Sequence, residues 1–535
     1  AGVRGKNPMR YSGGLLGGSW LTAFASDLGQ GKFDGAWLVQ NFENQNPANT
    51  LWSKQYNLYS KIDTEAPRYL GFERWWGGHV NLNAEEIQFI VDELFIGNNL
   101  AAGRIQTSDG TTIDLRSIRS PIVVFCSKGD NITPPQQALG WILDLYENVD
   151  EIRSYGQTIV YTIHETVGHL GIFVSGGVAK KEHGEFSSNI DLIDTLPPGL
   201  YEAVFENKDE DTANPDLASG NWVMRCEART LEDISALGGN DMADERRFAT
   251  AARVSETNLA LYRTFMQPIV RALVTAPVAD WIRQIHPMRL QYELFSDENP
   301  MVAPVVAALA DQVRKNRKSV AGDNPFVAMQ ENFSNQIVAT LDAWREASET
   351  LSERMFLSVY GSPTLQAALG IDPVATRRLR KATKNPLHRE LLQNRIDELK
   401  SRIPTGGLRA AIIRGLIYAG TSRAGIDERG FEIARRIRAE YEDLPISEFK
   451  ALVREQFNIL LVDQEAALAA IPSMLPPDSE TREKAYGIIN QILSARGELS
   501  AEDKKRMSEV AKLFGLEGGV THLRKVPKQP QAKAS

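Results

Sequence analysis

An acid and a histidine stand in this chain in an order that could perform acyl-transfer chemistry. Asp130 comes just after one short apolar run, and His169 follows a second such run further along the chain. In hydrolases that use a nucleophile, an acid and a histidine, the acid orients the imidazole and the histidine accepts the proton of the nucleophile. The order acid, then histidine, is that of the last two members of such a triad. We predict that Asp130 supports His169 as general base toward a serine or cysteine, through a covalent acyl-enzyme.

Two other interpretations of these residues stand beside the catalytic one. Asp130 could cap a turn, with His169 an ordinary loop histidine, and the spacing alone favours neither interpretation. His164, Glu165 and His169 also resemble the zinc motif H-E-x-x-H, but the two histidines are five residues apart rather than four. At about 100° per residue, that spacing separates the two imidazoles around a helix. We expect no metal and no cofactor in this chain.

Two strands and the helix between them must position the pair. Residues 121–126 form a short, continuous apolar run, which is typical of a strand covered on both faces in a parallel sheet. Thr133 and Pro134 are then predicted to be the N-cap and the first residue of a helix. A second strand is predicted over residues 158–163. Because reactive groups in open α/β sheets lie outside the carboxyl ends of the strands, an acid and a histidine placed there can meet.

Composition narrows the class of protein. The net charge of -8 gives no general attraction to nucleic acid. The two cysteines, Cys126 and Cys226, provide no disulfide framework, which predicts a reducing, cytoplasmic location. Cys126 falls inside a predicted strand, so we expect it to be a packing residue rather than the nucleophile. No apolar run approaches the roughly 18 residues of a membrane span, so we expect no transmembrane segment.

The nucleophile that this order requires has no candidate in the sequence. It should precede Asp130, on a strand-to-helix turn of the form G-x-[SC]-x-G. Ser12 and Ser19 each lack one of the two glycines, and Ser175 follows the histidine. The segment before Asp130 also lacks the β-α units that would carry such a turn. We therefore expect the nucleophile to precede Ala1 in a longer natural chain, and this chain alone to be inactive.

The first part of the chain is rich in large aromatic side chains. Five of the nine tryptophans stand within residues 20–76, in a segment with helical patterns. Aromatic residues at this density can line an apolar substrate pocket. They can equally be core residues, and we expect a core role for most of them. The five are Trp20, Trp37, Trp52, Trp75 and Trp76.

Several motifs in combination resemble those of polyhydroxyalkanoate synthases. They are GKFDG (31–35), NPANTLW (46–52), FERWW (72–76), IDLRSIRSP (113–121), GDNITP (129–134) and GHLG (168–171). Among related proteins the chain is most similar to a bacterial family labelled 3-hydroxyalkanoate synthetase-like, and the resemblance covers about residues 5–350. It implies an α/β-hydrolase fold with a helical cap, followed by a long helical extension. It also implies that Asp130 and His169 match the acid and base, that a cysteine or serine is the nucleophile, and that the substrate is a hydroxyacyl thioester or ester.

The C-terminal module, residues 405–517, contains two segments with similar sequence patterns. Asp427 and Ser500 precede helical patterns at equivalent N-cap positions, and an apolar residue stands before each of them, as in a hydrophobic staple. The module resembles the all-helical domain named after bacterial tellurite-resistance proteins. Metal binding is not expected, because the positions where acidic loop residues would stand are occupied by Arg423, Ala424 and Arg496.

Taken together, the patterns predict an α/β protein with a large all-α region. The predicted segments are a helical cap (1–105), the C-terminal part of an α/β-hydrolase core (106–190), a connector hairpin with a helical extension (191–400), the C-terminal module (405–517) and a disordered basic tail (518–535). The hairpin strands are predicted near residues 200–205 and 221–227.

Two functions from different classes are compatible with this organisation. The leading prediction is an acyltransferase or esterase acting on hydroxyacyl thioesters or esters. The alternative is a non-catalytic scaffold with a degenerate hydrolase fold, whose helical parts dock on a polymer granule, a membrane surface or a partner protein.

Overall fold

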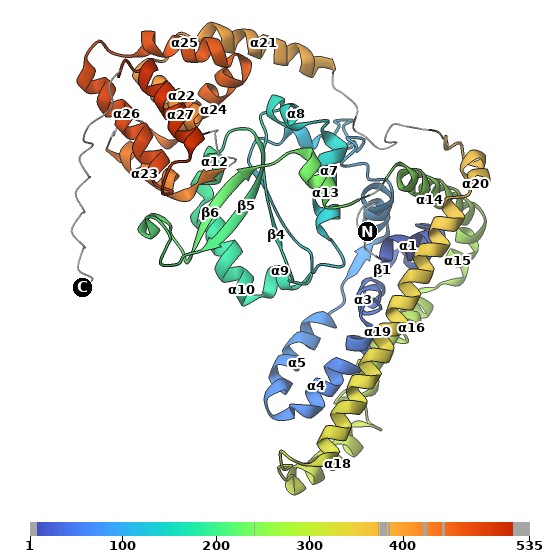
Figure 1. Ribbon diagram of the computed structural model, residues 1–535. Helices are drawn as coiled ribbons and strands as arrows, with labels where there is room; N and C mark the ends of the chain where they lie inside the picture. Colours follow the sequence, from blue (N-terminus) through green and yellow to red (C-terminus); the bar gives the residue numbers. More distant parts are fainter. Residues whose placement is uncertain are drawn as a thin grey trace. The chain divides into compact units, whose positions relative to one another are not determined.

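The computed structural model describes residues 8–239, 241–372, 374, 382, 386–420, 425–440 and 444–516. The chain forms two compact units, each built from two stretches of sequence (Figure 1). Unit 1 holds residues 1–100 and 239–380, and unit 2 holds residues 101–238 and 381–535. The segment predicted as one connector and extension, 191–400, therefore contributes to both units. The predicted tail (518–535), Arg423 and Ala424 lie outside the described residues.

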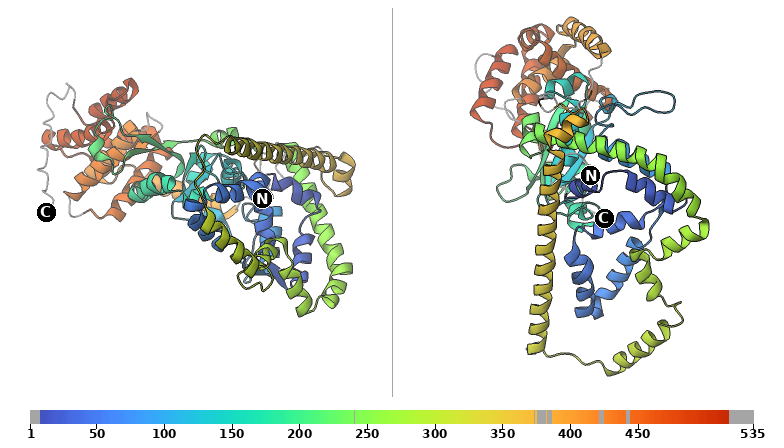
Figure 2. Two further views of the ribbon diagram at one scale, coloured as in Figure 1. Left: turned by 90° about the horizontal axis from the view of Figure 1, so that it is seen from below. Right: turned by 90° about the vertical axis from the view of Figure 1, so that its right-hand side faces the viewer.

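Unit 1 is built mainly from helices. Its first stretch contains α1 (Met9–Leu15), α2 (Trp20–Leu28), β1 (Lys32–Asp34), α3 (Ala36–Glu43), α4 (Lys54–Ser60), α5 (Ile62–Trp76), β2 (Asn81–Asn83) and α6 (Ala84–Phe89). Its second stretch contains α14 (Met242–Leu261), α15 (Gln267–Leu273), α16 (Ala276–Gln284), α17 (Pro287–Leu294), α18 (Ala303–Asn316), α19 (Pro325–Tyr360) and α20 (Pro363–Ala368). β1 and β2 form a small antiparallel sheet. Figure 2 shows α14 to α18 along one side of the unit, with α19 returning along the other.

A small aromatic core anchors the C-terminal end of α19 in unit 1. Phe356 and Tyr360 of α19 pack with Tyr11 of α1 and Phe248 of α14. The rings of Tyr11 and Phe356 meet edge to face, 5.3 Å apart, which is a favoured arrangement for aromatic pairs. At its other end, α19 begins with Pro325, directly after the N-cap residue Asn324. The side chain of Asn324 accepts a hydrogen bond from a backbone amide of the first turn. Aromatic packing therefore holds the C-terminal end of α19, whereas a side-chain cap stabilises its N-terminal end.

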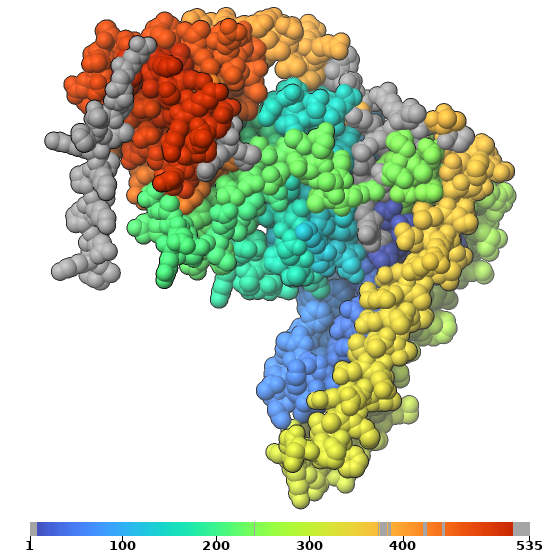
Figure 3. Space-filling model, in the orientation of Figure 1, coloured from blue at the N-terminus to red at the C-terminus, as the bar shows by residue number. Residues whose placement is uncertain are grey.

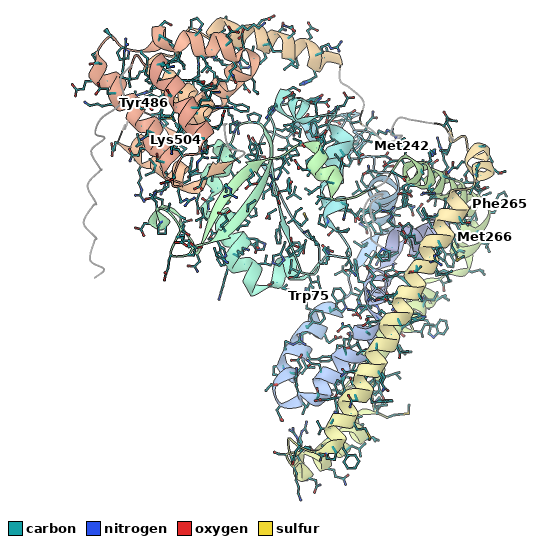
Figure 4. All side chains as sticks on the ribbon, in the orientation of Figure 1. Trp75, Met242, Phe265, Met266, Tyr486 and Lys504 are labelled. Carbon is teal, nitrogen blue, oxygen red and sulfur yellow. The ribbon has the colours of Figure 1, made fainter. Side chains whose placement is uncertain are left out.

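The expectation that most of the early tryptophans are core residues is wrong. None of the five is buried, and Trp75 on α5 is 59% exposed (Figure 4). Trp52 and Trp76 instead use their indole N–H groups, which donate to Ser334 Oγ at 2.8 Å and to Glu43 Oε1 at 2.7 Å. An indole carries one polar group on a large apolar body, so it is stable at a half-covered position where that group finds a partner.

Apolar side chains are also exposed on the second stretch of unit 1. A π-helical turn, Tyr262–Met266, joins α14 to α15, and Phe265 in this turn is 64% exposed (Figure 4). α19 lies at the surface of the unit (Figure 3) and carries exposed Phe333 and Trp344. No helix in the described ranges is both long enough and apolar enough to cross a membrane.

Unit 2 is organised around a five-stranded mixed sheet. Its strands are β3 (Ile122–Ser127), β4 (Thr158–His164), β5 (Gly199–Asn207), β6 (Trp222–Ala228) and β7 (Ile426–Asp427), in that spatial order. β3, β4 and β5 are parallel, whereas β5–β6 and β6–β7 are antiparallel. The two predicted strands around Asp130 and His169, and the predicted hairpin, are confirmed. The mixed α/β class of the chain is likewise confirmed.

Alternating side chains of the sheet build one core on each face. Ile159 and Tyr161 of β4 pack with Leu139 and Ile142 of α7 (Pro135–Leu145), whereas Val160 packs on the other side with Leu192 of α12 (Ile190–Thr195). Successive residues of a strand point to opposite faces, so a strand that is apolar throughout must be covered on both. The remaining helices of this part of unit 2 are α8 (Val149–Ser154), α9 (Gly171–Val174), α10 (Gly176–Val178), α11 (Gly184–Ser188) and α13 (Leu231–Ala236).

The C-terminal module packs around one helix with small side chains. After α21 (Pro386–Arg402) come α22 (Gly407–Gly420), α23 (Glu428–Ala439), α24 (Ile446–Val462), α25 (Gln464–Met474), α26 (Ser479–Ser494) and α27 (Ala501–Leu513). Gly415 of α22 lies so close to Ile489 and Val510 that an added Cβ would stand 3.1 and 3.3 Å from their methyl carbons. The small residue lets α26 and α27 approach α22 closely. Asp427 and Ser500 accept hydrogen bonds from backbone amides in the first turns of α23 and α27, which confirms both predicted N-caps.

The module joins the rest of unit 2 through the sheet and through the side chain of Arg429, which a buried ion pair holds in place. β7 pairs with β6, with Cys226 opposite Ile426. Asp427 binds the guanidinium of Arg429 through both carboxylate oxygens, at 2.8 and 2.6 Å, and Arg429 also donates to the carbonyl of Ala213. Two-point contacts of this kind fix orientation as well as distance.

A fully buried arginine is the basis of a stability prediction. Arg414 on α22 is 0% exposed and donates to Gln456 Oε1 and to the carbonyls of Ile403 and Ala467, each at 2.9 Å. Arg414→Met should lower the free energy of unfolding by about 3 kcal/mol, because it removes three buried hydrogen bonds from a charged donor. Urea unfolding followed by circular dichroism measures the change.

The control is Arg409→Met, which alters an exposed arginine on the same helix. It should change the free energy of unfolding by no more than about 0.5 kcal/mol. Equal effects of the two substitutions would show that the buried contacts of Arg414 do not stabilise the module.

Candidate active site

Two neighbouring parallel strands bring the predicted acid and the predicted histidine to the same edge of the sheet. The last residues of β3 and β4, Ser127 and His164, stand opposite each other in the register. Lys128 extends the pairing by donating its backbone N–H to the carbonyl of His164 at 2.9 Å. Asp130 and His169 follow on the two adjoining loops, at the carboxyl ends of their strands, as the sequence predicted.

Close contact between the two loops requires a glycine before the acid. A Cβ on Gly129 would stand 2.3 Å from the carbonyl oxygen of Thr166, a separation that atoms do not tolerate. The backbone of the acid loop therefore passes directly against the loop that carries His169. This approach leaves little freedom in the separation of the two functional side chains.

The carboxylate of Asp130 holds the imidazole of His169. Asp130 Oδ2 lies 2.9 Å from His169 Nδ1, and Asp130 is only 1% exposed. Its other carboxylate oxygen accepts the backbone N–H groups of Ile132 at 2.8 Å and Thr133 at 2.9 Å. Burial would raise the pKa of Asp130, but the hydrogen bonds from His169 and Thr133 outweigh it and lower the pKa to about 2. The group is thus ionised at neutral pH.

An ionised carboxylate determines which imidazole nitrogen is free. Because an ionised carboxylate can only accept hydrogen bonds, His169 Nδ1 carries the proton in this contact. The lone pair of the neutral ring is therefore on Nε2. The His169 side chain is 30% exposed, so the ring is held on one side and accessible on the other. This is the arrangement that a general base requires.

Thr133 is a third member of the site, although its place before Pro134 predicts an N-cap. The helix after Asp130 begins at Pro135, with Pro134 at the N-cap position, so the prediction of Thr133 as N-cap is wrong. Its hydroxyl lies 2.7 Å from Asp130 Oδ2 and 3.2 Å from His169 Nδ1. The side chain thus supports the carboxylate directly. Only its place three residues after the acid could have suggested this contact.

His164 positions the loop that carries His169. His164 is the last residue of β4, and its Nδ1 accepts the backbone N–H groups of Thr166 and Val167, both at 3.1 Å. Its Nε2 lies 4.0 Å from the buried carboxylate of Glu182. One nitrogen of His164 is therefore used to shape the loop. In the described residues no group of three or more histidine, cysteine or acidic side chains is arranged to hold a metal ion.

Neither cysteine is suited to attack a substrate. Cys126 and Cys226 are both buried in the sheet, and burial raises the pKa of each thiol to about 12. The packing role expected of Cys126 is confirmed. Ser175 caps α10, where its hydroxyl accepts the backbone N–H of Val178 at 3.4 Å. Within the described ranges, no serine or cysteine forms a hydrogen bond with Nε2 of His169.

Comparison with known proteins places the chain in a family. The model of the family described as "Protein of unknown function (DUF3141)" matches residues 1–403, which include both Asp130 and His169. The chain belongs to this family. A relative from Rhizobium meliloti, described as "Uncharacterized protein in ackA 5'region", is 64% identical over 521 residues, which are 97% of this chain and 71% of the relative. No solved structure matches the chain. The family match ends just after α21, before the C-terminal module.

The lowered pKa of Asp130 predicts a pH-dependent contribution to stability. In the folded chain the pKa is about 2, below the ordinary value of 3.8, so the ionised form stabilises the fold. The contribution is about 2 kcal/mol, is fully present above about pH 4, and is lost as the pH falls toward about 2. Asp130→Asn should therefore destabilise the chain at pH 7, and the difference from wild type should shrink below pH 4.

Urea-unfolding midpoints of both proteins at several pH values between 7 and 3 measure this difference. Asp233→Asn is a suitable control, because Asp233 is an acid of the same unit that likewise accepts a backbone N–H but lies at an exposed position. A difference between wild type and Asp130→Asn that stays constant over the whole range would contradict the assignment.

Proposed function

We propose that Asp130 and His169 are the acid and base of an α/β-hydrolase-type site that transfers or hydrolyses acyl groups of hydroxyacyl thioesters or esters. The observation that carries the proposal is the 2.9 Å contact between Asp130 Oδ2 and His169 Nδ1. It occurs at the carboxyl ends of neighbouring parallel strands, where α/β enzymes place their reactive groups. The β3–α7–β4 unit also fits the acid, helix and histidine part of an α/β-hydrolase fold.

The chemistry follows from the two nitrogens of the ring. Nε2 of His169 takes the proton of the attacking hydroxyl or thiol as the new bond to the acyl carbon forms. The imidazolium that results keeps its Nδ1–H on Asp130, and the carboxylate stabilises the positive charge. When the tetrahedral intermediate collapses, Nε2 returns the proton to the leaving thiol or alcohol. Asp130 stays ionised throughout, in accordance with its pKa of about 2.

The nucleophile in this proposal is the serine or cysteine that the resemblance to polyhydroxyalkanoate synthases implies. Cys126 and Cys226 are excluded from that role by their burial and raised pKa. The substrate class also comes from the resemblance. The acceptor of the acyl group is water, an alcohol or the hydroxyl end of a growing polyester.

Two observations favour a second candidate, the non-catalytic scaffold. In the described residues, Nε2 of His169 has no hydroxyl or thiol partner, and several large apolar side chains of α15 and α19 are exposed. A retained hydrolase scaffold that binds a granule or a partner protein would combine both features. The two candidates differ in whether His169 is needed for turnover.

The decisive substitution is His169→Ala in the protein at its natural length. Acyl release from a 3-hydroxyacyl coenzyme A thioester should fall by roughly 100-fold or more, because the general base is lost. The melting temperature should fall by a few degrees, because the buried Asp130 loses one donor, but the variant should stay folded, since the backbone N–H groups of Ile132 and Thr133 still bind the carboxylate. The thiol released per unit time, measured with a thiol-reactive dye, gives the rate.

His388→Ala is the matched control, because His388 is a partly buried histidine of the same unit. Its ring stacks on Tyr155, whereas that of His169 is hydrogen-bonded to an acid. It should retain full activity. Equal turnover of wild type and His169→Ala would overturn the proposed function, and the absence of turnover in wild type would favour the scaffold.

A further inference from the structure

A cavity of about 530 Å³ lies inside unit 2, between the sheet and the C-terminal module. Its walls come from α12, β5 and β6 on one side and from α22, α23, α24 and α26 on the other (Figure 1). Most of the lining side chains are aliphatic or aromatic, among them Leu196, Ile413, Ile417, Phe431, Val453 and Ile492. The lining of the cavity is therefore mainly apolar.

The size of the cavity is that of a binding site rather than of a packing defect. Protein interiors are packed as closely as organic crystals, and voids much larger than a water molecule are few. Pockets for small molecules enclose about 300–1,000 Å³ and are lined mostly by apolar groups with a few polar ones. The cavity of unit 2 has both this size and this kind of lining. An apolar molecule that filled it would make van der Waals contacts that the lining side chains otherwise lack.

Arg153 supplies a polar group at one end. It belongs to α8 and lines the cavity, and its guanidinium lies 5.8 Å from the ring centre of Phe457. One of its nitrogens, Nη1, donates to Asp150 at 2.7 Å, but its Nε is buried without a hydrogen-bond partner. A buried N–H without an acceptor is costly, and a ligand oxygen would satisfy it. Arg153 also lines a smaller hollow beside Thr230 and Asn148.

One carboxylate lines the cavity, but its charge is paired, so it would not repel a bound anion. Asp427 lines the cavity, but both of its oxygens are bound by the guanidinium of Arg429. Arg496 lines the wall as well and pairs with the buried Asp503 at 3.5 Å. Asp427 therefore does not compete for Arg153, whose own ion pair is with the exposed Asp150 at 2.7 Å.

The cavity is separate from the Asp130–His169 pair. Arg153 precedes β4, and Thr195 and Pro197, which line the cavity, precede β5. These residues lie at the amino ends of the parallel strands, whereas Asp130 and His169 follow the carboxyl ends of β3 and β4. The two features occupy opposite edges of the sheet.

We propose that this cavity binds a single aliphatic chain that ends in a carboxylate. The chain lies among the apolar side chains of α22, α23 and α24, and the carboxylate accepts hydrogen bonds from Arg153. An aliphatic chain is the occupant that matches a mainly apolar lining, and a carboxylate matches the fork of N–H donors on a guanidinium. The site does not depend on the proposed acyl transfer, because it shares no residue with that site.

Binding of dodecanoate to the whole chain, followed by isothermal titration calorimetry, tests the proposal. Wild type should bind it saturably at one site. Ala434→Phe, which fills the cavity from α23, should weaken binding by roughly tenfold or more. Ala439→Phe is the matched control, because Ala439 is exposed on the same helix, and it should bind as wild type does. Thermal unfolding shows whether each variant is folded.

The carboxylate contact has its own test. Arg153→Met keeps the apolar stem and removes the charge, so it should weaken dodecanoate binding by roughly tenfold and leave the binding of dodecanol unchanged. This variant also keeps the proposal testable if Ala434→Phe does not fold. Binding that neither substitution weakens would place the ligand elsewhere and overturn the proposal, as would the absence of saturable binding to wild type.

Discussion

The parallel pairing of β3 with β4 is the constraint on which the candidate site depends. It sets Ser127 beside His164 and so starts two loops from the same edge of the sheet. The close approach of Gly129 to Thr166 then fixes how far apart the loops can be. Given these two facts, the contact between Asp130 and His169 needs no movement of the backbone. The side chains around it, Thr133 and His164, restrict it further.

Several buried polar groups of unit 2 each have more than one hydrogen-bond partner. Asp130, Arg414 and the Asp427–Arg429 pair are all removed from water, and each is bound by several donors or acceptors. A buried charge without partners would destabilise the fold strongly, so such groups specify one arrangement of the surrounding segments. In the C-terminal module this arrangement ties α23 to the sheet. The module thus lies in unit 2 together with the sheet.

The elements that carry the site could be predicted because their signals are local. The apolar runs near residues 121–126 and 158–163 are β3 and β4, and the caps Asp427 and Ser500 stand where predicted. Thr133 was misassigned, because a hydroxyl before a proline also suits an N-cap, and only the folded loop shows its contact with Asp130. The tryptophans of unit 1 were expected in the core, although an indole is equally stable at a half-covered surface. β7 and the cavity arise where segments far apart in the sequence pack together, and a two-residue strand leaves no pattern to detect.

The central claim is that Asp130 holds the proton of His169 on Nδ1 and leaves Nε2 free to accept another. Nitrogen NMR of the ¹⁵N-histidine-labelled chain tests it directly, with the His169 signals assigned by their loss in His169→Gln. The neutral ring should be protonated on Nδ1, with a downfield Nδ1 proton that disappears in Asp130→Asn. A neutral ring protonated on Nε2, with no effect of Asp130→Asn, would contradict it.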